Sequence, residues 1–135
     1  MEKIYISRSI NIISRNLRNK YKRNFKKFNI NESQYQYMIY LYNATKPVCQ
    51  EDLVIKFNID KAAVARGIKN LIDEGYIIKL RSLEDKRLYH LTLTNKAEMI
   101  RKDFFEILDN INNELLNDFN EEELLLLDSF LNRLT

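Results

Sequence analysis

Apolar residues recur at helical spacing along most of this chain. Across residues 6–28 they return every three or four positions, which predicts one long amphipathic helix. Asn31 followed by Gln34 has the spacing of a capping box, so a second helix is expected to run from there to about Ala44 and to stop before Pro47. The sequence contains two glycines and one proline, so few positions interrupt helices.

Two shorter helices and a pair of strands are predicted next. Residues 50–57 form a short amphipathic pattern, and Asp60 is a good N-cap for a fourth helix that ends at Gly75. Residues 76–80 and 88–94 are rich in β-forming side chains, and the second run alternates apolar and polar positions. The short charged segment between these runs predicts a β-hairpin.

The C-terminal third returns to helical spacing. Thr94 is the expected N-cap of a long helix, and Asn120 with Glu123 forms another capping box before a leucine-rich helix. The order helix-helix-helix-helix-hairpin-helix-helix predicts a mostly α fold with a small β-hairpin wing. This order is typical of a winged helix-turn-helix with long N- and C-terminal helices.

The length of 135 residues indicates a single domain, 1–135. Its middle, 31–94, would be the winged helix-turn-helix lobe, and 1–30 and 95–135 would be the flanking helices. One cysteine excludes a disulfide within the chain. The sequence shows neither a targeting segment nor a run apolar enough to span a bilayer. We therefore expect a cytoplasmic protein without a membrane partner.

The predicted helix after Asp60 has a pattern suited to DNA. One face is apolar, with Val64, Ile68 and Leu71, and Ile72 beside them. The opposite face combines small side chains, which allow close approach to the major groove, with long donors that reach bases or phosphates. The residues of this face are Lys61, Ala62, Ala65, Arg66, Lys69 and Asn70. An ordinary solvated face is the alternative, but the preceding short helix and the following cationic hairpin favour a recognition helix.

The hairpin tip carries two cations behind an acid. Arg87 is the candidate for insertion into the minor groove, which is narrow and negative, and Lys86 adds a second positive charge. Asp85 could hold the Arg87 guanidinium by a charge-assisted hydrogen bond and so orient it before DNA binds. The alternative is a solvated turn with a weak surface ion pair.

These residues resemble the MarR (multiple antibiotic resistance regulator) family. The matching stretches are "CQEDLVIKFNIDKAAVARGIKNLIDEGYI", the wing residues Asp85-Lys86-Arg87 and "LTLTNKA". The resemblance implies a homodimer whose first and last helices intertwine. It also implies binding to a palindromic operator in double-stranded DNA, with repression of nearby genes that a small molecule or other signal relieves. By position, the implied DNA contacts are Lys61, Ala62, Ala63, Arg66, Asp85 and Arg87.

The sequence departs from the family pattern at a few positions. Alanines occupy positions 62, 63 and 65, where the family often has Ser or Thr, so sequence preference would depend more on the wing and on DNA shape. Gly67 lies within the recognition helix at a cost of about 1 kcal/mol relative to Ala, which indicates close packing at that point. Ala97 replaces a common Gly, with no expected consequence.

Charge is distributed very unevenly along the chain. Residues 1–30 contain nine Lys or Arg against one acid, and residues 103–135 contain nine acids against one Arg. Both segments could be solvated helix faces, or they could lie against each other within a chain or between chains. A dimer would also cover the apolar stripes of the terminal helices, which include Ile6, Ile10, Ile13, Phe130, Leu131 and Leu134.

Ligand and sensor sites are less strongly indicated. Four tyrosines cluster on the second helix, near the place where related proteins bind small aromatic effectors; half-buried packing at a helix crossing is the simpler interpretation. They are Tyr35, Tyr37, Tyr40 and Tyr42. Cys49 is interpreted as a helix cap, with a redox role as the alternative. With His90 as the one histidine, no metal site is expected.

Catalytic motifs are missing from the sequence. It has no glycine-rich phosphate loop and no paired carboxylates in an apolar context, so neither an enzyme nor a cofactor is expected. The stronger rival to a DNA-binding regulator is a winged-helix protein-interaction module, similar to an antirepressor, with weak or no DNA binding. Such a module has little use for Arg66, Lys69 and the cationic tip.

Overall fold

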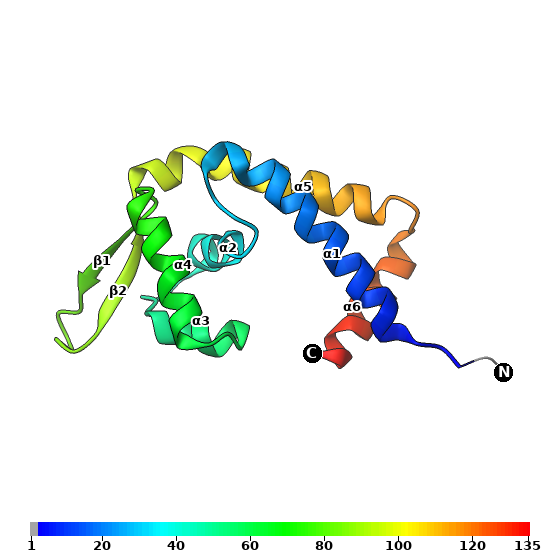
Figure 1. The fold of residues 1–135 in the computed structure, drawn as a ribbon, viewed down its shortest axis with the longest axis horizontal. Coiled ribbons are helices and arrows are strands. Elements are labelled where there is room, and N and C mark those ends of the chain that lie inside the picture. Colours follow the sequence, from blue (N-terminus) through cyan, green and yellow to red (C-terminus); the bar gives the residue numbers. More distant parts are fainter. Residues whose placement is uncertain (1–2) are drawn as a thin grey trace.

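The computed structural model describes residues 3–135 and has the predicted fold class, mostly helical with one antiparallel hairpin (Figure 1). Met1 and Glu2, which belong to the expected N-terminal dimerisation segment, lie outside the described residues. The elements are α1 (Ile6–Phe25), the 3-10 helix η1 (Lys26–Phe28), α2 (Tyr35–Asn43), α3 (Gln50–Phe57), α4 (Lys61–Asp73), β1 (Ile77–Arg81), β2 (Tyr89–Leu93), α5 (Asn95–Leu116) and α6 (Glu121–Leu134).

The chain forms an arch. Helices α1 and α5 run side by side across its top, and α2, α3, α4 and the hairpin form a lobe at one end (Figure 1). Helix α6 turns back beside the beginning of α1 at the other end. The hairpin pairs Ile77 with Leu93 and Arg81 with Tyr89, and Leu91 also bridges to Val48. The helix-turn-helix and its wing therefore lie together, away from the free end of α1.

Two helix boundaries differ from the sequence prediction. The first helix ends at Phe25 and continues as the 3-10 turn η1 to Phe28, because the fully buried Phe25 fixes the chain before the left-handed Asn29. The capping box of the second helix does form, with the Gln34 amide donating to Asn31 Oδ1 at 3.0 Å. Regular helix nevertheless starts only at Tyr35, since the intervening residues form a turn.

Aromatic side chains make up much of the core where α1, α2 and α5 cross. The Phe25 and Phe104 rings lie 4.8 Å apart, and Phe104 also meets Tyr42 with its ring centroid at 5.2 Å. The Tyr42 hydroxyl donates to the main-chain carbonyl of Ala97, a fully buried residue at the start of α5. This core ties the winged lobe to the long helices.

The end of α4 is fixed to the beginning of α5. Thr94, the N-cap of α5, donates through its hydroxyl to the Gly75 carbonyl and through its amide to the Tyr76 carbonyl at 3.0 Å. The Lys96 ammonium donates to the Glu74 carbonyl, where a cation is favoured by the dipole of α4. Gly75 itself has φ of +85°, the left-handed conformation that glycine adopts readily.

The same point is also fixed to the end of α1. The Tyr76 hydroxyl donates to the Phe28 carbonyl at 2.6 Å, and the Asn29 side-chain amide donates to Glu74 Oε1 at 2.6 Å. Residues 74–76 thus connect α4 to both long helices; we call them the α4–α5 junction.

Helices α1 and α6 leave apolar surface uncovered. No residue of α6 is buried, and Leu125, Phe130 and Leu134 are among its exposed large side chains. An apolar groove of about 810 Å³ runs between α1, α5 and α6, with Ile10, Leu116 and Leu131 in its lining. In the part of the chain that the structure describes, the basic and acidic ends are joined by the ion pair of Lys20 and Glu114, with Lys20 Nζ 3.1 Å from Glu114 Oε1. Within residues 3–135, no helix has the length and apolar character needed to cross a membrane.

Candidate nucleic-acid interface

The recognition helix begins where its cap predicts. Asp60 accepts the Ala63 amide through its side chain at 2.8 Å and so starts α4 at Lys61. The buried face is Val64, Ile68 and Leu71, with Ile72 partly buried. The opposite face is solvent-exposed at Lys61, Ala62, Ala65, Arg66, Lys69 and Asn70. Ala63 is half-buried, so it presents less surface than its neighbours to a partner.

Gly67 lets α4 approach α2 closely. A Cβ atom at this position would lie 2.7 Å from Tyr37 Cε2, well inside van der Waals contact. Tyr37 is 2 % exposed, and its ring also meets Phe57 of α3 edge-on at 5.7 Å. The glycine inside the recognition helix is therefore explained by the tyrosine ring that it accommodates.

Lys69 has a partner before any nucleic acid arrives. Its ammonium lies 2.9 Å from Asp73 Oδ2, one helical turn further along, and both side chains are exposed. An exposed pair of this kind contributes between 0 and about 1 kcal/mol. A phosphate could therefore replace the carboxylate at little cost.

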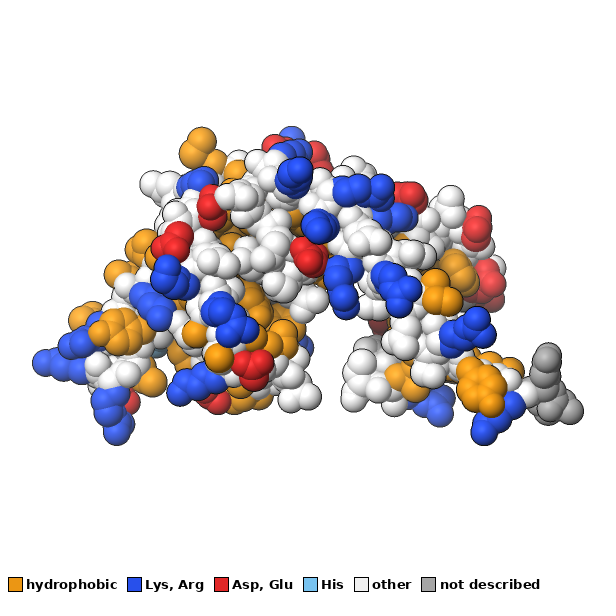
Figure 2. Space-filling model, viewed as in Figure 1, with side chains coloured by type: hydrophobic (Ala, Val, Ile, Leu, Met, Phe, Trp, Pro, Cys, Tyr) orange, Lys and Arg blue, Asp and Glu red, His pale blue; other side chains and the backbone are white. Residues whose placement is uncertain are grey.

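The hairpin tip holds Arg87 in a fixed geometry. Arg87 Nε and Nη2 donate to the two carboxylate oxygens of Asp85, each at 3.0 Å, and the Arg87 amide donates to Asp85 Oδ1. These hydrogen bonds from Arg87 lower the pKa of Asp85 below its usual value, so the carboxylate stays ionised. The Arg87 side chain is still 88 % exposed. The neighbouring Lys86 is exposed too, and Figure 2 shows cationic side chains at this end of the hairpin.

Ser82 supports this geometry and was not identified from the sequence. It is 6 % exposed, and its hydroxyl accepts the amides of Glu84 and Asp85 at 3.3 and 3.2 Å. Its own amide donates to the Leu88 carbonyl at 2.9 Å. The signal that could have revealed it is a serine three positions before an aspartate in a turn, a spacing that favours local side-chain capping.

The four tyrosines of α2 lie in two environments, so they do not line one common pocket. Tyr37 and Tyr42 belong to the core, because the helical turn directs both toward the helices that α2 packs against. Tyr35 and Tyr40 line a hollow of about 780 Å³ between α2 and α3. Tyr35 also stacks on Tyr21 of α1, with ring centroids 4.1 Å apart.

Cys49 occupies the N-cap position of α3, as predicted. Its amide donates to Asp52 Oδ2 at 2.9 Å, and its sulfur lies 3.4 Å from the same oxygen. His90 lies partly buried on β2. Across residues 3–135, no group of three or more His, Cys, Asp or Glu side chains is placed to hold a metal ion.

Comparison with known proteins assigns this arrangement to a family. Residues 19–104 match a family model described as transcriptional regulator SarA/Rot, and these residues include the helix-turn-helix, the wing and the start of α5. The chain belongs to the SarA/Rot family. This SarA/Rot protein is 30% identical over 98 residues to the HTH-type transcriptional regulator BilQ of Clostridioides difficile, covering 73% of the chain and 66% of BilQ.

Further relatives agree with this assignment. The HTH-type transcriptional regulator YdgJ of Bacillus subtilis is 35% identical over 100 residues, which are 73% of this SarA/Rot protein and 60% of YdgJ. The chain thus spans just under two thirds of the length of these curated relatives. A MarR family transcriptional regulator of Listeria monocytogenes, solved with 26mer DNA, superposes with a TM-score of 0.88 at 29% identity, over 99% of this chain and 87% of that one.

The MarR resemblance read from the sequence is therefore confirmed, and with it the assignment to winged-helix transcriptional regulators. The protein-interaction module is not favoured, because the Listeria relative with the same fold was solved bound to DNA.

Proposed function

We propose that this SarA/Rot protein is a homodimeric repressor that occupies a palindromic operator near the genes it controls. It acts in the cytoplasm and carries out no catalysis. A small molecule or other signal releases it from the operator. The observation that carries the proposal is the hairpin tip, where Asp85 fixes an almost fully exposed Arg87. A guanidinium held in this way loses less side-chain entropy when it enters a minor groove.

In this proposal the recognition helix reads the major groove. Lys61, Arg66 and Asn70 provide long donors on its exposed face, while Ala62 and Ala63 allow close approach. Lys69 contacts a phosphate after leaving Asp73. In the wing, Arg87 enters the minor groove, Asp85 orients it, and Lys86 adds attraction to the phosphates.

The terminal segments 1–30 and 95–135 provide the dimer interface. The exposed apolar residues of α1 and α6 and the groove between these helices support this role, since surface of this size and character on a water-soluble domain usually marks an interaction site. The two recognition helices would then lie about 34 Å apart, one turn of duplex.

The hollow lined by Tyr35 and Tyr40 is the place we propose for an aromatic effector. It lies between α2 and α3, next to the helix-turn-helix, so that a ligand there would bias the placement of α3 and with it α4. Lys46 and Lys56 also line it and could pair with an acidic group of the ligand.

The proposal is tested by fluorescence anisotropy with duplex from upstream of the protein's own gene against scrambled duplex, with sedimentation to measure mass. Arg87→Ala should weaken upstream binding at least tenfold and leave the dimer mass unchanged. The matched control is Lys102→Ala, which removes an exposed cation of α5 outside the recognition helix and the wing. Equal affinity for both duplexes would refute an operator in this region, and absence of DNA binding together with capture of a protein partner would restore the rival module.

A further inference from the structure

Helix α1 carries a line of cations on the side opposite its apolar stripe. Arg8, Arg15, Lys22 and Lys26 are spaced by seven, seven and four residues, so they follow one face of α1 and η1, with Arg23 beside them. All five are exposed. We call these five residues the basic ridge; Figure 2 shows cationic side chains along the surface formed by α1.

Within residues 3–135, the ridge makes no ion pair. The ion pair that α1 makes there joins Lys20 to Glu114, and Lys20 lies off the ridge, on the side of α1 that faces α5. Helix α1 contains no acidic residue. The five charges of the ridge therefore face solvent or a partner that carries negative charge.

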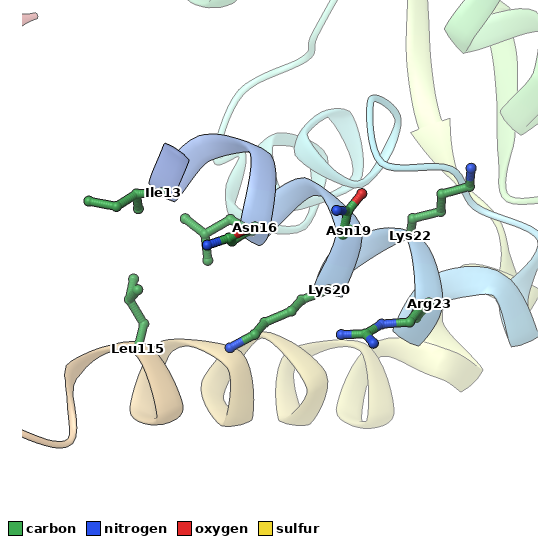
Figure 3. Close-up of a pocket in the computed structure, with 8 residues that line it drawn as sticks. Ile13, Asn16, Asn19, Lys20, Lys22, Arg23 and Leu115 are labelled. Atoms are coloured by element: carbon green, nitrogen blue, oxygen red, sulfur yellow. The ribbon is translucent and has the colours of Figure 1, made fainter. Parts of the chain in front are cut away.

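A hollow of about 580 Å³ lies between α1 and α5, and two residues of the ridge, Lys22 and Arg23, border it. Asn16, Asn19, Lys22 and Arg23 line it from α1, and Leu115 lines it from α5 (Figure 3). In this view the Arg23 side chain extends toward α5, whereas that of Lys22 points away from it. The eight lining residues include no carboxylate, and amide and cationic donors of this kind suit phosphate oxygens.

The ridge also reaches the recognition helix. Lys22 and Lys26 line a polar cleft together with Asn70, which lies on the exposed face of α4. The cleft also contains three carboxylates: Asp73 pairs with Lys69, Glu74 accepts the Asn29 amide, and Glu32 lines the cleft as well. The ridge thus meets the recognition helix at a cleft of mixed charge, and its positive surface is formed by α1 and η1 themselves.

We propose that the basic ridge is a second nucleic-acid site, which binds the phosphate backbone of duplex DNA outside the operator. The inference rests on the proposed function in one respect, that the recognition helix and wing are occupied by operator. A duplex phosphate backbone fits because the site is long, straight and cationic. Arg8 to Lys26 spans about 27 Å at 1.5 Å per residue, the length of roughly eight base pairs.

The binding should depend strongly on salt and weakly on sequence. Each phosphate contact adds about 0.9 to the slope of log K against log salt, so five cations give a slope of roughly −4.5 per ridge. A fourfold increase in salt then lowers the binding constant about 3.5-fold for each contact. Base readout is not expected, since the ridge presents backbone-directed charges on one helix face.

The test uses the full chain saturated with a short labelled upstream duplex of about 20 base pairs, to which a non-operator duplex with a second label is added. Energy transfer between the labels and the sedimentation coefficient both report a ternary complex. The ridge variant is Lys22→Gln with Lys26→Gln, and the matched control is Lys79→Gln with Lys102→Gln, an equal charge change at exposed positions off the ridge. A yeast tRNA sample of equal phosphate concentration serves as a competitor.

We expect the wild type and the control to form the ternary complex. The ridge variant should bind operator as the wild type does, but with a salt slope for the second duplex smaller by about 1.8. Three outcomes would overturn the site. In the first, the wild type does not bind the second duplex. In the second, the ridge and control variants bind it with the same salt slope. In the third, tRNA displaces the second duplex far more effectively than an equal phosphate concentration of duplex does. A change of oligomeric mass in the ridge variant without DNA would also overturn the site, because acidic residues of another copy would then occupy the ridge.

Arg87→Ala separates the two proposals. If the ridge acts as proposed, this variant loses the operator and still binds non-operator duplex with a dependence on Lys22 and Lys26. If the wild type shows no operator preference but the ridge dependence persists, the proposed function fails and the ridge stands.

Discussion

Substituting Gly67 by Ala tests the packing of the recognition helix, because two opposing effects of known size meet there. Helix propensity alone makes Gly67→Ala stabilising by about 1 kcal/mol. The added Cβ, however, would lie 2.7 Å from Tyr37 Cε2, and the Tyr37 ring is buried against Phe57 and has little room to move. Overpacking of this kind costs about 1–3 kcal/mol, so we expect a net destabilisation of roughly 1 kcal/mol.

The assay is urea unfolding followed by far-ultraviolet circular dichroism, at one fixed protomer concentration because dimerisation would shift the midpoint. Ala65→Gly is the matched control. Position 65 lies two residues away on the exposed face, so this change should cost about 1 kcal/mol from propensity alone.

A double-mutant cycle isolates the clash. In a Tyr37→Leu background the ring is gone, and Gly67→Ala should become neutral or stabilising by up to about 1 kcal/mol. If Gly67→Ala stabilises the otherwise unchanged protein, or costs the same in both backgrounds, close approach of α4 to α2 does not explain the glycine.

Three further outcomes are expected. Lys69→Ala should lower DNA affinity evenly across sequences and reduce the salt slope by about one. Asp73→Asn should raise DNA affinity slightly, because it frees Lys69. If Lys69→Ala lost affinity only for operators with one particular base, Lys69 would be a base reader and not a phosphate contact. Asp85→Asn should weaken operator binding by releasing Arg87, and the carboxylate's lowered pKa means that wild-type binding at pH 5 keeps this contact. Burial raises the pKa of Tyr21 from 10.0 to about 12, so its contribution to the free energy of unfolding should be constant below pH 10 and be lost as pH rises through 12. Tyrosinate absorbance measured against pH follows this ionisation. If Tyr21 were solvated, its tyrosinate would already form near pH 10.

Local chemistry explains which features could be predicted from the sequence. Asp60, Thr94 and Asn120 each accept the amide three residues ahead, and these caps depend only on neighbouring residues. The contact between Asp85 and Arg87 is equally local, since a single residue separates them in a turn. Such features can be derived before any tertiary contact is known.

Contacts between distant segments could not be derived in the same way. The separation of Tyr37 and Tyr42 from Tyr35 and Tyr40 depends on which helices α2 meets, and helical spacing alone does not determine this. The partial burial of Ala63 and the ion pair of Lys69 likewise depend on the exact placement of α4. The sequence therefore predicted the interface as a surface, and less well the environment of each residue in it.

The α4–α5 junction has a mechanical consequence. Because Thr94 and Lys96 fix the end of α4 to α5, and Tyr76 fixes it to the end of α1, the recognition helix cannot turn independently of the long helices. Helix α5 has 22 residues and acts as a lever about 33 Å long. A tilt of α5 by about 5° displaces the recognition helix by roughly 3 Å, which is about the rise of one base pair. Small adjustments far from the DNA can therefore move the recognition helix into or out of register with the grooves of the duplex.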